Sequence, residues 1–282
     1  MTEILDTHLH LVDRSRISYP WIEGAGSLER DWGLEEYAPI ASQAGITRAL
    51  HMEVDVAPAD IEAETAMIAN LPPREGLAIA GIISACRPEL DGFAAQIERA
   101  QAHDRIVGFR RVLHVVPDDL SRTDLFRQNM RRLGQAGLPF DLCVLARQLP
   151  IATELVDAAP ETQFVLDHCG VPDIAGGGFD SWARDLADLA RRENVAVKVS
   201  GLPAYAAKDW RADDLRPWTE HVTACFGPQR MVWGSDWFVC TLGGGLAQWV
   251  SASRELFAGL SGAERAALFS QNAERLWNLR PA

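Results

Sequence analysis

The fold is decided by a pattern that appears first at residues 3–11, EILDTHLHL. This is a short apolar segment with the length and composition of a single β-strand. Seven further segments of the same kind, rich in β-branched residues, follow along the chain: ITRALHMEV (46–54), LAIAGIIS (77–84), IVGFRRVL (106–113), PFDLCVL (139–145), TQFVLDHC (162–169), VAVKVSG (195–201) and RMVWGSDW (230–237). The sequence therefore predicts eight β-strands.

Stretches with helical periodicity separate these segments, among them LEEYAPIASQAG (34–45), ADIEAETAMIANL (59–71), LFRQNMRRLGQAG (125–137) and FDSWARDLADLARRE (179–193). A strand followed by a helix, repeated eight times in 282 residues, is what a (β/α)8 barrel requires. An open doubly wound sheet is the alternative, but it usually has a glycine-rich turn after its first strand, which this sequence lacks. We expect an α/β protein with a single TIM-barrel domain over residues 1–282.

Local signals mark several boundaries. Gly45 and Gly137 follow helical runs, where a left-handed residue commonly ends a helix. Ser261 and Glu264 have the spacing of a capping box at the start of the last helix. Two irregular pieces, 12–33 and 171–180, follow the first and sixth strands and are expected over the mouth of the barrel, where sites are built.

Composition excludes several classes of protein. The net charge of −12 argues against nucleic acid or an anionic membrane surface as the partner. No apolar run reaches 18 residues, and no secretion signal is visible. The five cysteines are scattered and include no C-x-x-C pair, which suits a reducing compartment. We expect a cytoplasmic protein that acts on a small molecule; its oligomeric state is not predicted.

The first strand carries two histidines. Residues two apart in a strand point the same way, so His8 and His10 share one face while Leu9 and Leu11 point towards the covering helices. At the carboxyl end of a barrel strand, the shared face is the mouth. Two hydrogen-bonded core histidines remain the structural alternative.

Two further candidates fall at the ends of other strands. His168 ends the sixth segment, and Asp236 ends the eighth, which neighbours the first in a closed barrel. Three imidazoles and one carboxylate that converge are able to bind a zinc-like divalent ion. Alternatively, the imidazoles polarise a carbonyl group while the carboxylate takes a proton from water.

Several motifs together resemble the amidohydrolase superfamily, and more closely its lactonase-rich branch, which includes L-fucono-, L-rhamnono- and 2-pyrone-4,6-dicarboxylate lactonases. The motifs are DTHLHL (6–11), LDHCG (166–170) and FGPQRMVWGSDWFV (226–239), supported by YPW, GFRRVL, RQLP and VKVSG. They occur in the family's order and cover nearly the whole chain.

The resemblance implies roles for the four candidates. His8 and His10 match the first-strand pair, His168 the sixth-strand histidine, and Asp236 the eighth-strand aspartate that activates water. Many members hold two metal ions with a further lysine or histidine from the fourth and fifth strands, where this chain has Arg110, Arg111, Asp141 and Cys143. A binuclear centre is therefore not expected. In several lactonases of this branch the histidines contact the carbonyl directly, and no metal is required.

A second group of residues is predicted to bind substrate. Arg110 resembles the arginine that the branch uses on substrate oxygens, with an inter-strand ion pair as the alternative. The other members are His51 and Glu53 for substrate hydroxyls, His114 at the end of the fourth strand, Lys198, which points inward on the seventh strand, and the loop residues Trp21 and Trp32. A carboxylate-paired lysine and tryptophans that cover the core are the structural alternatives.

The sequence and the resemblance together predict a hydrolase that opens a small lactone, most simply an L-fucono- or L-rhamnono-type sugar-acid lactone. Asp236 would activate water, and His8, His10 and His168 would stabilise the carbonyl oxygen. No cofactor is required, although one divalent ion such as zinc on the same four residues stays open. The alternatives are a mononuclear zinc-dependent decarboxylase, another metal-dependent hydrolase, and a non-catalytic binding protein.

Overall fold

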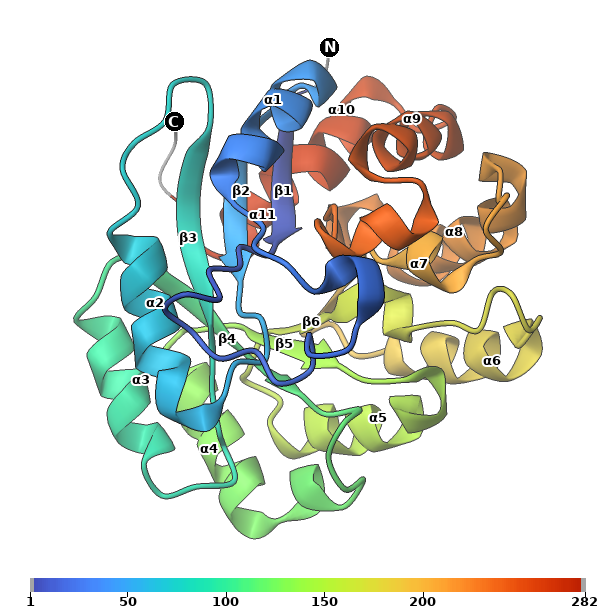
Figure 1. Cartoon of the computed structure of the whole chain (residues 1–282). Helices are drawn as coiled ribbons and strands as arrows, with labels where there is room; N and C mark the ends of the chain where they lie inside the picture. The colour runs from blue at the N-terminus through green and yellow to red at the C-terminus, as the bar shows by residue number, and fades with distance from the viewer. Residues whose placement is uncertain (1–2, 280–282) are drawn as a thin grey trace.

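Eight parallel strands form a nearly closed barrel surrounded by helices in the computed structural model, which describes residues 3–279 (Figure 1). The strands are β1 (Ile4–Leu9), β2 (Ile46–Met52), β3 (Ala78–Ala85), β4 (Ile106–Val112), β5 (Phe140–Cys143), β6 (Phe164–Leu166), β7 (Val195–Val199) and β8 (Met231–Trp233). They pair in chain order from β1 to β8. The predicted TIM barrel is confirmed. Each predicted strand segment overlaps one of these strands, and only β3 extends beyond its segment, by one residue.

The barrel closes beyond the end of β8. Leu9 forms an isolated parallel bridge with Trp237, and the backbone N–H of His10 donates to the Trp237 carbonyl at 2.9 Å. The residues that complete the barrel are therefore neighbours of His8, His10 and Asp236 in the sequence, so closure brings the first and last strand ends together.

The helices on the outside are α1 (Leu34–Ala44), α2 (Ile61–Ala69), α3 (Phe93–Gln101), α4 (Asp124–Gln135), α5 (Leu149–Ala158), α6 (Phe179–Leu189), α7 (Leu202–Tyr205), α8 (Ala212–Phe226), α9 (Leu246–Leu256), α10 (Gly262–Ala266) and α11 (Asn272–Leu276). Gly45 ends α1 at φ 76°, and Ser261 with Glu264 caps α10, as predicted. A π-helical turn, Ala267–Gln271, joins α10 to α11. Within residues 3–279, no helix is both long enough and apolar enough to cross a bilayer.

An apolar layer fills the amino-terminal part of the barrel. It is made of inward side chains from six strands together with Trp277, which follows α11. The strand residues are Leu5, Leu50, Met52, Ile83, Val165, Ala196 and Val232. Burial of such a layer stabilises the fold by roughly 25 cal/mol per Å² of apolar surface.

A charged layer lies above the apolar one. The Lys198 ammonium of β7 lies 2.7 Å from Asp141 Oδ1 of β5, 3.0 Å from Asp167 Oδ1 and 3.2 Å from His8 Nδ1. All four side chains are fully buried. Burial alone would lower the pKa of Lys198, but the two carboxylates raise it above its usual value, so the ammonium stays charged.

Replacing Lys198 is expected to destabilise the fold, because the carboxylates of Asp141 and Asp167 would stay buried without their cation. We expect Lys198→Met to lower the free energy of unfolding by about 3–5 kcal/mol, measured by urea denaturation. The matched control is Lys208→Met, since Lys208 is the chain's only other lysine and is exposed. Its effect should stay within about 0.5 kcal/mol. Equal effects of the two changes would contradict this account.

Candidate active site

A cavity of about 200 Å³ opens at the carboxyl end of the barrel. Its polar lining comes from several strand ends and loops, and four valines supply apolar walls. The lining residues are His10, Arg110, His114, His168, Asp236, Asp55, Tyr205, Cys143, Trp21, Val54, Val112, Val115 and Val239. A larger groove of about 1010 Å³ runs between loop 12–33 and α2, but no histidine lines it. The chemistry therefore belongs to the smaller cavity.

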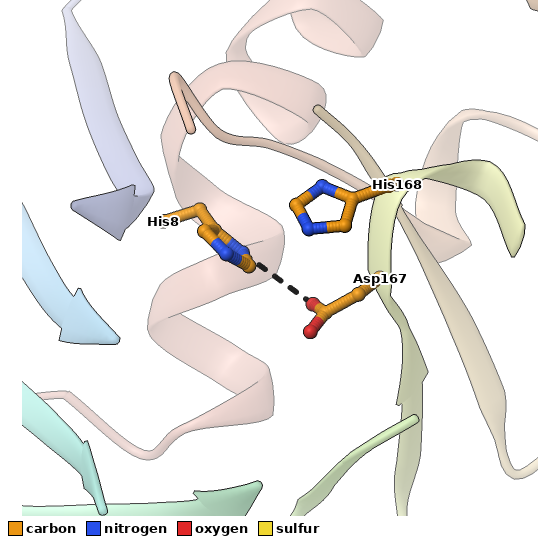
Figure 2. A group of neighbouring side chains, drawn as sticks. All are labelled: His8, Asp167 and His168. Carbon is orange, nitrogen blue, oxygen red and sulfur yellow. Dashed lines mark ion pairs between the residues drawn. The ribbon is translucent and has the colours of Figure 1, made fainter. Parts of the chain in front are cut away.

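The structure brings the four principal candidates together. Asp236 Oδ1 lies 3.6 Å from His10 Nε2 and 3.8 Å from His8 Nε2. The His8 ring centroid is 4.8 Å from that of His10 and 4.5 Å from that of His168. Figure 2 shows His8 of β1 facing Asp167 and His168, which follow β6. His8 is fully buried and lies behind the cavity wall, whereas the other three line the cavity.

A backbone hydrogen bond orients His10. Its Nδ1 lies 2.9 Å from the carbonyl oxygen of Met52, the last residue of β2. A carbonyl oxygen only accepts, so Nδ1 carries the hydrogen. Burial, with a contribution from Arg110, lowers the pKa of His10 to about 3. The ring is therefore neutral, and Nε2 faces Asp236 with a bare lone pair.

His168 and Asp236 both have left-handed backbone conformations, with φ 52° and 55°. Non-glycine residues in this region cost about 1–3 kcal/mol each and cluster at functional sites. Gly201 makes room for His168, because a Cβ atom at position 201 would lie 2.6 Å from His168 Nδ1. The same nitrogen lies 2.9 Å from Ser200 Oγ, which fixes the ring.

Arg110 is the cation of the cavity wall, and Glu53 holds it. Arg110 Nε donates to Glu53 Oε1 at 2.6 Å, and Nη2 donates to the Glu53 carbonyl at 2.6 Å. Nη1 lies 3.3 Å from His8 Nε2 and 3.5 Å from Asp167 Oδ2. These contacts fix the position of the guanidinium group, and Glu53 balances its charge.

His8 lies between two cations. Lys198 Nζ lies 3.2 Å from its Nδ1, and Arg110 Nη1 lies 3.3 Å from its Nε2. Both cations only donate, and a neutral imidazole has one bare nitrogen, so only one contact is a hydrogen bond. Burial and the Lys198 charge hold the pKa of His8 well below its usual value. His8 therefore acts as a neutral ring.

Asp236 faces the cavity, and no lysine or arginine among the described residues forms an ion pair with its carboxylate. Burial raises its pKa to about 6, against the lowering effects of His168 and Arg110. The group is therefore ionised at neutral pH and is a stronger base than an exposed aspartate.

Four residues predicted to bind substrate do not line the cavity. Leu50 and Met52 face the barrel interior, so His51 between them faces α2, with Nε2 3.4 Å from Glu64 Oε1. Trp32 is buried, donates to the Leu28 carbonyl and stacks on Phe238. Glu53 is committed to Arg110, and Lys198 lies beneath His8. Trp21, Arg110 and His114 do line the cavity, as expected.

Sequence reasoning missed Tyr205, Asp55, Asp167 and Asp141. Strand parity places Asp167 opposite His168, but the left-handed backbone at His168 lets both side chains face inward. The aspartate before His168 in LDHCG was the available signal. Tyr205 and Asp55 lie beyond strand ends, where periodicity carries no information about direction.

Two groups of side chains at the site have the spacing of metal ligands. His8, His10 and Asp236 offer ligand atoms within 4.8 Å of one another, and so do His8, Asp167 and His168. Ligands about 2.1 Å from a tetrahedral zinc ion lie about 3.4 Å apart, close to the two distances measured from Asp236. The bare His10 Nε2 also suits a ligand. The first set therefore fits one divalent ion, at the cost of the contact between Arg110 and His8.

Several known proteins are similar to this chain in sequence and in fold. The amidohydrolase family profile matches residues 5–279. L-fucono-1,5-lactonase of Burkholderia multivorans is 31% identical over 297 residues, covering 98% of this chain and 96% of that protein. 4-Sulfomuconolactone hydrolase of Rhizobium radiobacter is 26% identical, covering 82% of this chain and 74% of the relative.

A solved structure agrees with these matches. An amidohydrolase from Burkholderia multivorans with bound zinc superposes with a TM-score of 0.88 and 28% identity, over 99% of this chain and 100% of the other. With the family profile covering almost every residue, the chain belongs to the amidohydrolase family.

Proposed function

We propose that the protein hydrolyses a small lactone, with Asp236 as the general base. The observation that carries the proposal is the position of the Asp236 carboxylate at the cavity, with His10 Nε2 at 3.6 Å and with Arg110 and His168 in the same cavity. The names of the two relatives, both lactone hydrolases, support the same reaction class.

The reaction needs one base and one set of donors. A water held against Asp236 attacks the lactone carbonyl carbon as Asp236 takes one of its protons. Hydrogen-bond donors around the carbonyl oxygen contribute about 3 kcal/mol each in other enzymes, and Arg110 and His168 are placed for this task. The ring C–O bond then breaks, and the proton on Asp236 passes to the departing alkoxide. The product is an open hydroxy acid.

The cavity favours a small, neutral ring. Its volume of about 200 Å³ lies below the range of about 300–1,000 Å³ that suits drug-sized ligands. Arg110 is the one cation among the described lining residues, and Glu53 already balances its charge. A carboxylate on the substrate would therefore add an unbalanced negative charge, whereas a neutral carbonyl oxygen needs only an N–H donor. We therefore propose a sugar-acid lactone of the L-fucono or L-rhamnono type over an aromatic dicarboxylate.

A metal ion is compatible with this site and not required by the proposal. If a divalent ion occupied His8, His10 and Asp236, it would supply Lewis-acid polarisation and a more acidic water. In our proposal the protein's own groups act on an activated ester: Asp236 accepts the proton, and Arg110 and His168, which line the same cavity, donate to the carbonyl oxygen.

The base assignment predicts a large loss of activity in Asp236→Asn. We expect kcat/KM for lactone opening to fall by about 10²–10⁴-fold, since a positioned general base contributes that much. The measurement is a pH-indicator assay with aldonolactones, muconolactones and a pyrone dicarboxylate, each in excess zinc and in excess chelator. Asp209→Asn, an exposed aspartate, is the control and should be unchanged. Absence of lactone opening by the unmodified protein, or an active Asp236→Asn, would contradict the proposal.

The raised pKa of Asp236 predicts the pH profile. Only the ionised carboxylate accepts a proton, so activity should be lost as the pH falls through the pKa of about 6. We expect log kcat/KM to be level above that pH and to drop by about one per pH unit well below it. A profile that stays level down to pH 4 would show that another group is the base.

A further inference from the structure

The unprotonated ring nitrogen of His10, Nε2, faces a second hydrogen-bond acceptor, the Asp236 carboxylate. The Nδ1 hydrogen is committed to the Met52 carbonyl at 2.9 Å, so Nε2 has none to give. On that side Asp236 Oδ1 lies 3.6 Å from Nε2. Two lone pairs that face each other in a buried site repel, unless a donor lies between them.

A single water molecule satisfies both acceptors. Water has two hydrogens, and ordinary hydrogen bonds of about 2.8 Å to each acceptor span a separation of this size. Its oxygen lone pairs would then be free to face the cavity, which His10 and Asp236 both line. A substrate carbonyl oxygen at the same position would meet two acceptors and no donor.

The donors lie elsewhere in the same cavity. Arg110 carries only N–H groups, and its position is fixed by Glu53. His168 Nδ1 is engaged by Ser200 Oγ, and with the hydroxyl as donor the Nε2 hydrogen of His168 is free for a ligand. A carbonyl oxygen is therefore better placed towards Arg110 and His168 than towards His10.

We infer that His10 holds the attacking water: His10 Nε2 accepts one of its hydrogens while Asp236 Oδ1 accepts the other. This rests on the proposed lactone hydrolysis and changes the carbonyl-stabilising role that the sequence predicts for His10. During attack the new C–O bond forms as Asp236 takes its proton; His10 keeps its hydrogen bond and takes no proton. The ring C–O bond then breaks, the alkoxide receives the proton from Asp236, and the new carboxylic acid releases its own proton to solvent.

The surroundings of His10 hold its ring in this orientation. The Met52 carbonyl accepts from Nδ1 at 2.9 Å, so Nε2 is the nitrogen that accepts. His10 is 4% exposed, and its ring contacts Phe238 at 6.2 Å between centroids, which restricts reorientation.

Hydroxylamine distinguishes a histidine that holds the attacking water from one that stabilises the carbonyl oxygen. As a strong neutral nucleophile it attacks a lactone without a base to activate it, and it gives a hydroxamic acid that is detected by its ferric complex. It still needs a polarised carbonyl. In His10→Phe we expect hydrolysis to fall by about 10²-fold while hydroxamate formation falls by only about 3-fold, when both are measured in excess chelator.

Two further variants complete the test. His168→Phe removes a group on the carbonyl side, so hydrolysis and hydroxamate formation should fall together. His10→Gln places an acceptor oxygen near the position of Nε2, so its hydrolysis should recover part of the loss seen in His10→Phe.

Three outcomes would overturn the inference. Parallel loss of both reactions in His10→Phe would place His10 at the carbonyl. Loss of hydrolysis by the unmodified protein in chelator alone would place an ion, and not water, on His10 and Asp236, although lactone hydrolysis itself would stand. Failure of the unmodified protein to open any lactone, by water or by hydroxylamine, would remove the proposed function as well.

Discussion

Two buried cations and three buried carboxylates determine how the site is arranged. Lys198 is held by Asp141 and Asp167, and Arg110 is held by Glu53. Cations inside a barrel are costly unless they are paired, so these carboxylates fix where the positive charge lies. Both cations then lie next to His8, one at each nitrogen. Burial, with the charge of Lys198, holds the pKa of His8 well below its usual value, so the imidazole is neutral.

In a neutral imidazole one ring nitrogen donates a hydrogen bond and the other accepts one, and the position of the hydrogen decides which. His10 is an acceptor towards the cavity because its other nitrogen donates to Met52. Asp236 remains the carboxylate that no lysine or arginine neutralises at short range, and burial makes it more basic. The site therefore separates acceptors, which suit a water molecule, from donors, which suit a carbonyl oxygen. That separation is what ester hydrolysis requires.

Much of this arrangement could be predicted from the sequence. The eight strands were predicted because short apolar segments alternate with helical periods, and the common face of His8 and His10 because a strand repeats every two residues. The inward direction of Lys198 followed from the same rule, but its partners did not, because Asp141 and Asp167 lie 57 and 31 residues away in the sequence. The positions of His168 and Asp236 after the sixth and eighth strands predicted that they reach the mouth, but no periodicity predicts the left-handed backbone of these two residues. Trp32 and His51 were expected at the mouth because they lie in the loop after the first strand and near the end of the second, whereas packing turns them away.

The hydrogen position on His10 is the most direct test of this account, and it does not require a substrate. Long-range ¹H–¹⁵N NMR correlation of the metal-free protein, with His10→Gln used to assign the signal, reports which ring nitrogen carries the hydrogen. We expect a hydrogen on Nδ1 and none on Nε2, unchanged from pH 8 to pH 5, because burial lowers the pKa of His10 to about 3. A hydrogen on Nε2, or a doubly protonated ring above pH 5, would contradict it.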